Sequence, residues 1–301
     1  MIDFSAHDDE LLLEDSARRF ADEQLRPCER AHEATGCFPP ELRARYEGLG
    51  LCDVLAQTSL AIAAIAWEWL AAGDPAAPLA LGPPRGVVVV VEQLATPFEV
   101  PWLPCARPTS LSIVAPQGVT RASDLIVEPL AAASCGLRAA GAARVTVRQP
   151  GKVIGDAADA ARWLVDLRVF AAACMLGAAR DAASYARLYA RERTAFGRPI
   201  AHHQGLAFEL VDAATELDAA GLLLGLAAAS EEPAAVAHAH ALVTETAQRV
   251  AERSLQALGG HGYLHDHPIE KRMRDIRALA SLYGGAIASE RDAVDHVLEA
   301  A

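Results

Sequence analysis

The feature that most limits the possible folds is a proline-free, alanine-rich stretch between Asp156 and Arg198. Alanine and leucine are strong helix formers, and a run of this length without proline predicts one long helix. Proline and glycine then interrupt the sequence at intervals typical of helix ends. The expected helices lie near residues 160–192, 201–230, 233–258 and 268–282, with a last one from about residue 286. This order predicts a four-helix bundle with an extra helix over residues 156–301.

Residues 1–82 also have a helical character. Apolar side chains recur at helical spacing in the first helix, at Leu13, Ala17, Phe20, Ala21 and Leu25. Pro27 is expected to end that helix, because a proline inside a helix removes a backbone hydrogen bond. Further apolar helical segments follow up to Gly73.

Residues 83–155 differ in composition. Short β-branched or apolar segments alternate with prolines and glycines, as strands and turns require. The expected strands include residues 87–91, 111–114, 125–127 and 143–147. The sequence therefore predicts a mainly α protein with a small β domain, divided into an N-terminal helical domain (1–82), a shortened β domain (83–155) and a C-terminal helical bundle (156–301).

The chain of 301 residues carries 27 Lys and Arg against 39 Asp and Glu, for a formal net charge of −12. An acidic chain without a basic run argues against nucleic acid or an anionic membrane as a partner. Its first residues lack the basic start and apolar run of a secretory signal. The cysteines are Cys28, Cys37, Cys52, Cys105, Cys135 and Cys174. They form no close metal-ligand pair, and we expect buried thiols in a reducing, cytoplasmic environment.

Several short motifs follow one another in the C-terminal half. They are Arg193-Thr-Ala-Phe196-Gly197 with Gln204 nearby, Gln256-Ala-Leu-Gly259-Gly260-His-Gly262, and Arg274-Asp275 shortly before Tyr283-Gly284. Their order and spacing resemble the C-terminal helical half of the acyl-CoA dehydrogenases, flavoenzymes that desaturate acyl-CoA thioesters. The resemblance implies the acyl-CoA dehydrogenase fold: an N-terminal helical domain, here a truncated β-barrel-like middle domain, and a four-helix bundle.

The resemblance also implies a set of residues that contact the FAD of a neighbouring subunit. These residues are Arg193, Phe196, Gln204, Gln256, Gly259 and Gly260. The residue types suit the role, because an arginine offers a rigid donor fork to a pyrophosphate. Phe196 is expected to share a helical face with Arg193 and to pack on the adenine. The glycines let the backbone approach a ligand without a clash from Cβ.

The sequence departs from the family pattern at the catalytic base. Relatives place a glutamate where this chain has Gly284, or at an alternative helical position that here is Leu167. Asp166 is adjacent, but one residue along a helix turns the side chain by about 100°, so we expect it to point elsewhere. The loop and strand that hold the isoalloxazine ring within the same subunit also have no counterpart in this sequence.

These losses imply a non-catalytic subunit of a heteromeric FAD-dependent acyl-CoA dehydrogenase. A homologous full-length partner would carry the catalytic glutamate and hold most of the FAD, in an α2β2 assembly. The substrate would be an acyl-CoA, such as a bulky steroid side-chain thioester, and an electron-transfer flavoprotein or similar protein would accept the electrons. The alternatives are a non-enzymatic, homo-oligomeric scaffold and an acyl-thioester hydratase or dehydratase on the same fold.

Other polar residues have simpler interpretations. The histidines at 265 and 267, and at 238 and 240, are expected to be solvated and not to bind a metal. Glu290 and Asp292 could in principle replace the missing base, but we expect them to face solvent from the last helix. Arg168 is expected either to touch the acyl-CoA or to form a salt bridge within the bundle.

Overall fold

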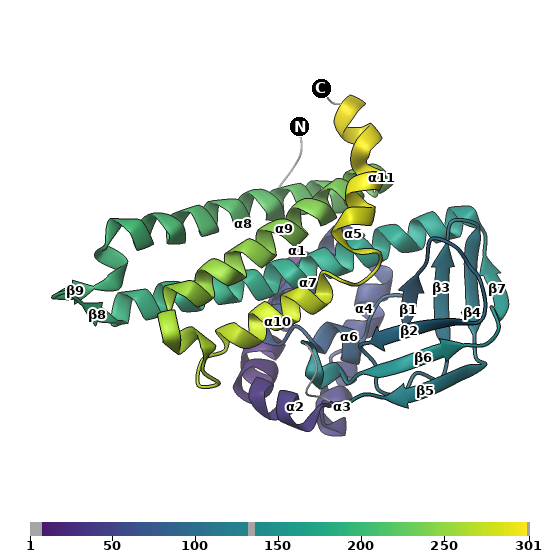
Figure 1. Ribbon diagram of the computed structural model, residues 1–301, viewed down its shortest axis with the longest axis horizontal. Coiled ribbons are helices and arrows are strands. Elements are labelled where there is room, and N and C mark those ends of the chain that lie inside the picture. Colours follow the sequence, from purple (N-terminus) through teal and green to yellow (C-terminus); the bar gives the residue numbers. More distant parts are fainter. Residues whose placement is uncertain (1–7, 132–135, 300–301) are drawn as a thin grey trace.

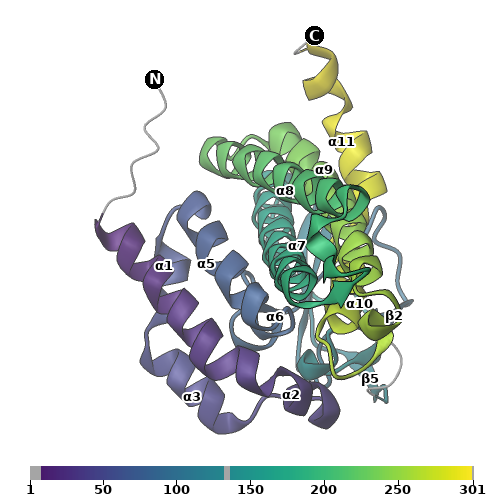
Figure 2. The same cartoon turned by 90° about the vertical axis from the view of Figure 1, so that its left-hand side faces the viewer.

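The computed structural model describes residues 8–131 and 136–299 and has the mainly α architecture with a small β region that the sequence predicts. Helices fill most of the molecule, the two larger sheets lie at one end, and a short hairpin of two strands lies at the other (Figure 1). The long C-terminal helices run side by side away from the strands, and the N-terminal helices pack along them (Figure 2).

The N-terminal part is helical as expected. Its elements are α1 (Asp8–Phe20), η1 (Ala21–Leu25), η2 (Arg26–Cys28), α2 (Glu29–Thr35), α3 (Pro40–Gly48), α4 (Leu51–Gln57), α5 (Leu60–Gly73) and α6 (Ala77–Leu81). The predicted apolar positions of the first helix are all buried. The prediction that Pro27 ends the run is wrong, because the chain continues helically to Thr35. Pro27 lies in the first turn of η2, where its missing N–H breaks no hydrogen bond.

The β region contains the predicted strands. One sheet has the strand order β1 (Val88–Val90), β3 (Leu111–Ala115), β4 (Gly118–Ala122) and β7 (Lys152–Gly155), and another has the order β2 (Phe98–Leu103), β6 (Ala143–Val147) and β5 (Leu125–Pro129). The strands β1 and β3 are parallel, whereas the other paired strands of these two sheets are antiparallel. Alternating residues of β6, Ala143, Val145 and Val147, are fully buried between the sheets, as the two-residue period of a strand requires.

The C-terminal helices match the predicted positions closely. They are α7 (Ala157–Glu192), α8 (Gln204–Ser230), α9 (Pro233–Ala257), α10 (Ile269–Leu279) and α11 (Gly285–Glu299). Asp156 begins α7 through a capping box, in which its carboxylate accepts from the Asp159 amide at 3.0 Å. The middle of α7 is buried along its whole circumference, because α5, α8, α9 and α10 all pack against it (Figure 2).

Helix α10 is joined to the N-terminal helices by buried ion pairs. The ammonium of Lys271 lies 2.8 Å from an oxygen of Asp74 and 2.7 Å from one of Asp275. Burial alone would lower the pKa of Lys271, but the two carboxylates keep that pKa raised above its ordinary value. Arg272 donates to Asp181 at 2.8 Å and to Glu29. These contacts hold α7 and α10 against the N-terminal part of the chain.

The expectation of buried cysteines holds for Cys174 but is wrong for Cys28 and Cys37, which are exposed. Cys105 is half-buried. Cys135 lies outside the described residues, and the side chain of Cys52 is likewise not described. Among the described residues, no helix combines the length and apolar character needed to cross a lipid bilayer.

Candidate functional site

The first motif lies in a hairpin beyond the end of α7. Arg193 follows the last helical residue, and the chain then turns through β8 (Thr194–Ala195) and β9 (Arg198–Pro199). The expectation that Arg193 and Phe196 share a helical face is therefore wrong. Phe196 and Gly197 form the tip with φ of 53° and 80°, the left-handed pair that a two-residue hairpin turn requires.

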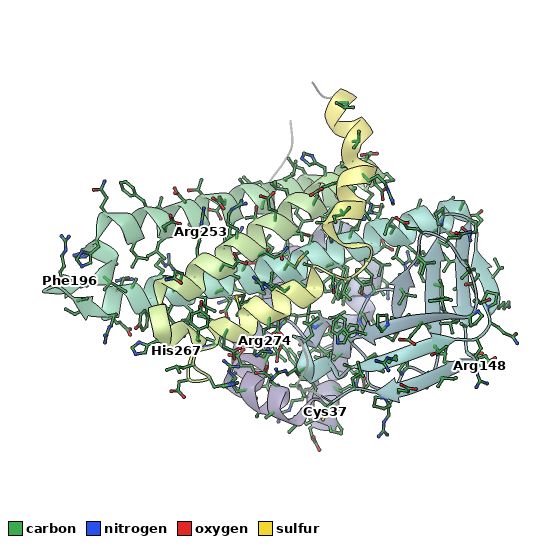
Figure 3. All side chains as sticks on the ribbon, in the orientation of Figure 1. Cys37, Arg148, Phe196, Arg253, His267 and Arg274 are labelled. Atoms are coloured by element: carbon green, nitrogen blue, oxygen red, sulfur yellow. The ribbon has the colours of Figure 1, made fainter. Side chains whose placement is uncertain are left out.

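Phe196 is 96% exposed, so its ring projects from the end of the bundle (Figure 3). The only ring contact that we find for it within the described residues is an edge contact with His203, at 6.0 Å between centroids. A large apolar side chain left in water in this way is typical of a surface that another molecule covers.

The other predicted contact residues lie at the same end of the bundle. Gln204 is the first residue of α8, and Gln256 is the penultimate residue of α9. After α9 the chain enters η5 (Gly259–Tyr263), where Gly259 has a φ of 58°. Figure 1 places the hairpin and the end of α9 at one end of the molecule, far from the sheets. Arg193, Gln204, Gln256 and Gly260 are exposed, so these predicted residues are accessible at that end of the bundle.

The expected position of the catalytic base, Gly284, lies at a cleft between the bundle and the β region. Gly284 lines a cavity of about 390 Å³ between β1, β3, the first half of α7 and α11. The backbone is left-handed here, with φ of 54° at Tyr283 and 93° at Gly284. Leu167, the alternative position, is 0% exposed and packs in the core. Neither position therefore presents a carboxylate to the cleft.

The carboxylates that do line this cleft are bound to arginines. Arg168 donates to Asp292 at 2.6 Å, and Arg291 donates to Glu92 at 2.7 Å. Glu290 and Asp292 are both exposed, as expected, and Asp292 also lines the cavity. Arg168 forms the salt bridge that the sequence left as one of two possibilities. Both carboxylates are therefore engaged in ion pairs with arginines at the wall of the cleft.

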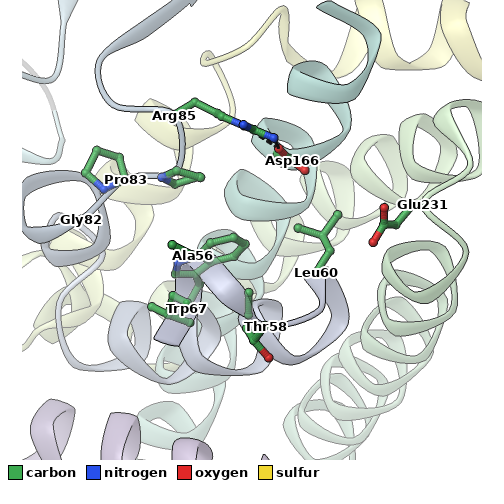
Figure 4. Close-up of a pocket in the computed structure, with 12 residues that line it drawn as sticks. Ala56, Thr58, Leu60, Trp67, Gly82, Pro83, Arg85, Asp166 and Glu231 are labelled. Atoms are coloured by element: carbon green, nitrogen blue, oxygen red, sulfur yellow. Dashed lines mark hydrogen bonds and ion pairs between the residues drawn. The ribbon is translucent and has the colours of Figure 1, made fainter. Parts of the chain in front are cut away.

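Asp166 lines a different cavity, as expected from its position on the helix. This cavity of about 390 Å³ lies between α5, the segment after α6, and α7, and its apolar wall includes Leu60, Ala63 and Trp67 (Figure 4). Asp166 forms an ion pair with Arg85 at 2.6 Å. The guanidinium of Arg85 also lies over the Trp163 ring, at 5.3 Å from the centroid. Asp166 is thus held at the wall of this cavity by its arginine.

The expectation of solvated histidines is wrong for His240. This side chain is fully buried, and its Nδ1 lies 2.9 Å from Ser289 Oγ. Burial, with a contribution from the charge of Arg168, lowers the pKa of His240 to about 3. His240 therefore remains neutral near the cleft at physiological pH. Among the described residues, no group of three or more His, Cys, Asp or Glu side chains is placed to hold a metal ion.

Replacing His240 with glutamine should make the fold less sensitive to acid. The ordinary histidine pKa of 6.5 applies to the unfolded chain, and the folded pKa is about 3. The native state therefore loses stability as the pH falls from 6.5 toward 3. At about pH 5 the loss is about 2 kcal/mol, since one pKa unit corresponds to about 1.4 kcal/mol.

Urea unfolding at about pH 7.5 and about pH 5 measures this difference. The variant should lose about 2 kcal/mol less than the unaltered chain between the two pH values. His202→Gln, on an exposed residue, serves as the control. An equal loss in His240→Gln and the unaltered chain would show that His240 is not the source of the acid sensitivity.

One group of contacts at the exposed end was not predicted from the sequence. The hydroxyl of Tyr189 lies 2.6 Å from His261 Nδ1, and that of Tyr185 lies 2.8 Å from His267 Nδ1. The two tyrosines are separated by one helical turn, and Arg193 follows after another turn. This one-turn spacing along α7 is the sequence feature that could have indicated the group. Its histidine partners, however, are more than 70 residues away in the sequence.

The C-terminal half of the chain is similar in sequence to known proteins. A family model described as "Acyl-CoA dehydrogenase, C-terminal domain" matches residues 155–298. The chain is 43% identical over 122 residues to a 3-sulfinopropanoyl-CoA desulfinase of Cupriavidus necator, covering 39% of this chain and 31% of that protein. It is 35% identical over 123 residues to the mitochondrial isobutyryl-CoA dehydrogenase of Dictyostelium discoideum, covering 39% and 30%. The matched segment therefore spans about a third of these relatives.

Solved structures resemble a much larger part of the chain. Butyryl-CoA dehydrogenase from Megasphaera elsdenii has a TM-score of 0.80 at 18% identity, covering 99% of this chain and 100% of that chain. A glutaryl-coenzyme A dehydrogenase in complex with glutaryl-CoA has a TM-score of 0.82 at 19% identity, covering 98% and 97%. At these identities the similarity establishes the fold.

Proposed function

We propose that this chain is a non-catalytic subunit of a heteromeric FAD-dependent acyl-CoA dehydrogenase. The match of residues 155–298 to the acyl-CoA dehydrogenase C-terminal domain and the acyl-CoA dehydrogenase fold of the chain support this proposal. The observation that carries the proposal is a contrast between two sites. Gly284 and Leu167 stand at the two base positions, while Arg193, Phe196 and Gln256 are exposed together at the far end of the bundle.

The exposed end suits the adenosine diphosphate part of an FAD held mainly by a partner. The guanidinium of Arg193 would bind a pyrophosphate, and the uncovered ring of Phe196 would pack on the adenine. A Cβ added at Gly260 would meet no atom within 4 Å, which leaves room for a ligand close to the backbone. When bound, FAD supplies the hydride acceptor for desaturation of the acyl group.

The partner would be a homologous full-length subunit that carries the catalytic glutamate, in an α2β2 assembly. An exposed apolar stripe on α8 supports an interface with another subunit. Phe208, Val211, Leu222 and Leu226 are exposed, and their spacing places them on one face of the helix. We propose a cytoplasmic enzyme acting on a bulky acyl-CoA, such as a steroid side-chain thioester, with an electron-transfer flavoprotein or similar acceptor.

Expression with and without the partner tests the proposal. The chain alone should be colourless and inactive, because neither base position carries a carboxylate. Co-expressed with a homologue that carries the glutamate, it should copurify as a yellow complex that reduces an electron acceptor with acyl-CoA. A yellow and active preparation of this chain alone would refute the proposal. A colourless, inactive homo-oligomer that binds no homologue would favour the scaffold alternative.

Within the complex, Arg193→Ala should weaken FAD binding by about 10-fold to 100-fold. A hydrogen bond to a charged group contributes about 1.5–3 kcal/mol, and 1.4 kcal/mol corresponds to a factor of ten. Flavin fluorescence on dilution of the complex measures the affinity. Arg191→Ala is a matched control, since Arg191 is an exposed arginine in the last turn of α7. Equal FAD affinity in Arg193→Ala and Arg191→Ala would show that Arg193 does not contribute to FAD binding.

A further inference from the structure

Tyrosine and histidine side chains form a connected group at the end of α7. Tyr189 contacts His261 Nδ1 at 2.6 Å, and Tyr185 contacts His267 Nδ1 at 2.8 Å. The two imidazole rings stack, with 5.9 Å between centroids and 28° between planes. The edge of the Tyr189 ring also meets His267, at 5.8 Å. These contacts join α7 to the segment that follows α9.

The hydrogen bonds occupy Nδ1 of each imidazole. We assign the tyrosine phenol, which can donate or accept, as the donor to the Nδ1 lone pair. Burial raises the pKa of the Tyr185 phenol above its ordinary value, which keeps that donor protonated. A neutral imidazole that accepts at Nδ1 has its proton on Nε2. His261 thus presents an Nε2–H donor on the side of the ring away from Tyr189.

The position of His261 connects this donor to the exposed surface. His261 lies between Gly260 and Gly262 in η5 and is exposed. Its neighbour Gly262 is closed in, because a Cβ there would lie 2.4 Å from the Leu255 carbonyl oxygen, whereas Gly260 borders open space. The turn therefore packs Gly262 against the protein and leaves Gly260 and the His261 ring accessible to a ligand.

We propose that His261 is a further ligand-contacting residue, donating from Nε2 to a pyrophosphate oxygen of the bound dinucleotide, and that Tyr189 positions it. This inference rests on the proposed function, since it assigns an additional donor to the same surface. The ring is held by a hydrogen bond and by stacking before any ligand arrives, and such preorganisation increases affinity. The arrangement adds a preorganised donor at the end of the bundle that carries Arg193 and Gln256.

The test uses the purified complex of this chain with its flavin-holding partner. His261→Phe should weaken FAD binding about tenfold, because a hydrogen bond to a charged oxygen is lost, while His261→Gln should keep most of the affinity through its amide donor. Tyr189→Phe should give an intermediate loss. His265→Phe changes an exposed histidine of the same segment and should have no effect.

A second measurement separates direct contact from a structural role. In phosphorus NMR spectra of the bound FAD, the pyrophosphate resonances should shift in His261→Phe and stay in place in His265→Phe. Unchanged affinity and spectra in His261→Phe, together with weaker binding in Arg193→Ala, would overturn the role of His261 and leave the proposed function standing. A complex that contains no flavin before any substitution would overturn both.

Discussion

Arg272→Met is expected to destabilise the fold by about 3–5 kcal/mol, the range observed when one partner of a buried ion pair is removed. Arg272 is fully buried. Its Nε donates to Asp181 at 2.8 Å, its Nη1 donates to Glu29, and its Nη2 donates to the carbonyl oxygens of Ala72 and Gly73 at 3.3 Å. Methionine fills much of the same volume but removes the cation that pairs with Glu29 and leaves Arg26 as the ionic partner of Asp181.

Urea unfolding of the isolated chain measures the effect, and the same helix offers a matched control. Arg277 in α10 pairs with Glu252, and these side chains are 56% and 53% exposed. Arg277→Met should change the unfolding free energy by no more than about 1 kcal/mol, because solvent screens an exposed pair. Similar losses in both variants would show that burial of Arg272 contributes little to the cost.

This network also shows where prediction from sequence reaches its limit. The segment Ile269–Leu279 is rich in charge, and its pattern predicts a helix with a solvated face. The structure instead buries Lys271, Arg272 and Asp275. Their partners Asp74 and Asp181 lie 197 and 91 residues away from Lys271 and Arg272 in the sequence, so no local pattern could identify them. The same reason explains why the Arg168–Asp292 pair was left open.

The helices and the position of the candidate contact residues near helix ends could be predicted because both depend on local patterns. Apolar spacing determined the buried face of the first helix, and proline or glycine marked the ends of α7, α8 and α9. The motif residues follow helix ends, so they gather where the helices of the bundle end. The Arg193–Phe196 geometry could not be predicted. Thr194 and Ala195 are compatible with a continuing helix, and the turn depends on Phe196 adopting a left-handed φ of 53°, which is uncommon for a bulky residue.

The burial of His240 was missed for a related reason. A histidine in an alanine-rich helix has no local partner that distinguishes a solvated ring from a buried one. Its hydrogen-bond partner Ser289 lies 49 residues away on α11. The path of α11 depends on the left-handed turn at Tyr283–Gly285. The sequence contains the two glycines of that turn, but not the direction in which the following helix leaves it.

The close approach of α5 and α7 predicts a second large effect, at Gly177. A Cβ at this position would lie 2.0 Å from the carbonyl oxygen of Glu68 and 3.0 Å from its Cα. These are backbone atoms, so the clash cannot be relieved by a side-chain rotation, and α5 must move away from α7. Protein interiors are closely packed, and forced backbone shifts of this kind cost about 3 kcal/mol. We therefore expect Gly177→Ala to destabilise the fold by about 3 kcal/mol.

Gly225→Ala is the matched control, because Gly225 also lies within a long bundle helix but a Cβ there would meet no atom within 4 Å. It should stabilise the chain by about 0.5–1 kcal/mol, since alanine restricts the unfolded backbone more than glycine does. Opposite signs for the same substitution would show that contact between helices, and not helix propensity, requires glycine at 177. If both variants gained stability, a Cβ at Gly177 would have to lie more than 2.0 Å from the Glu68 carbonyl oxygen. Helices α5 and α7 would then have to be further apart. The Trp67–Phe170 edge contact at 5.1 Å across the same pair of helices would then need to be looser as well.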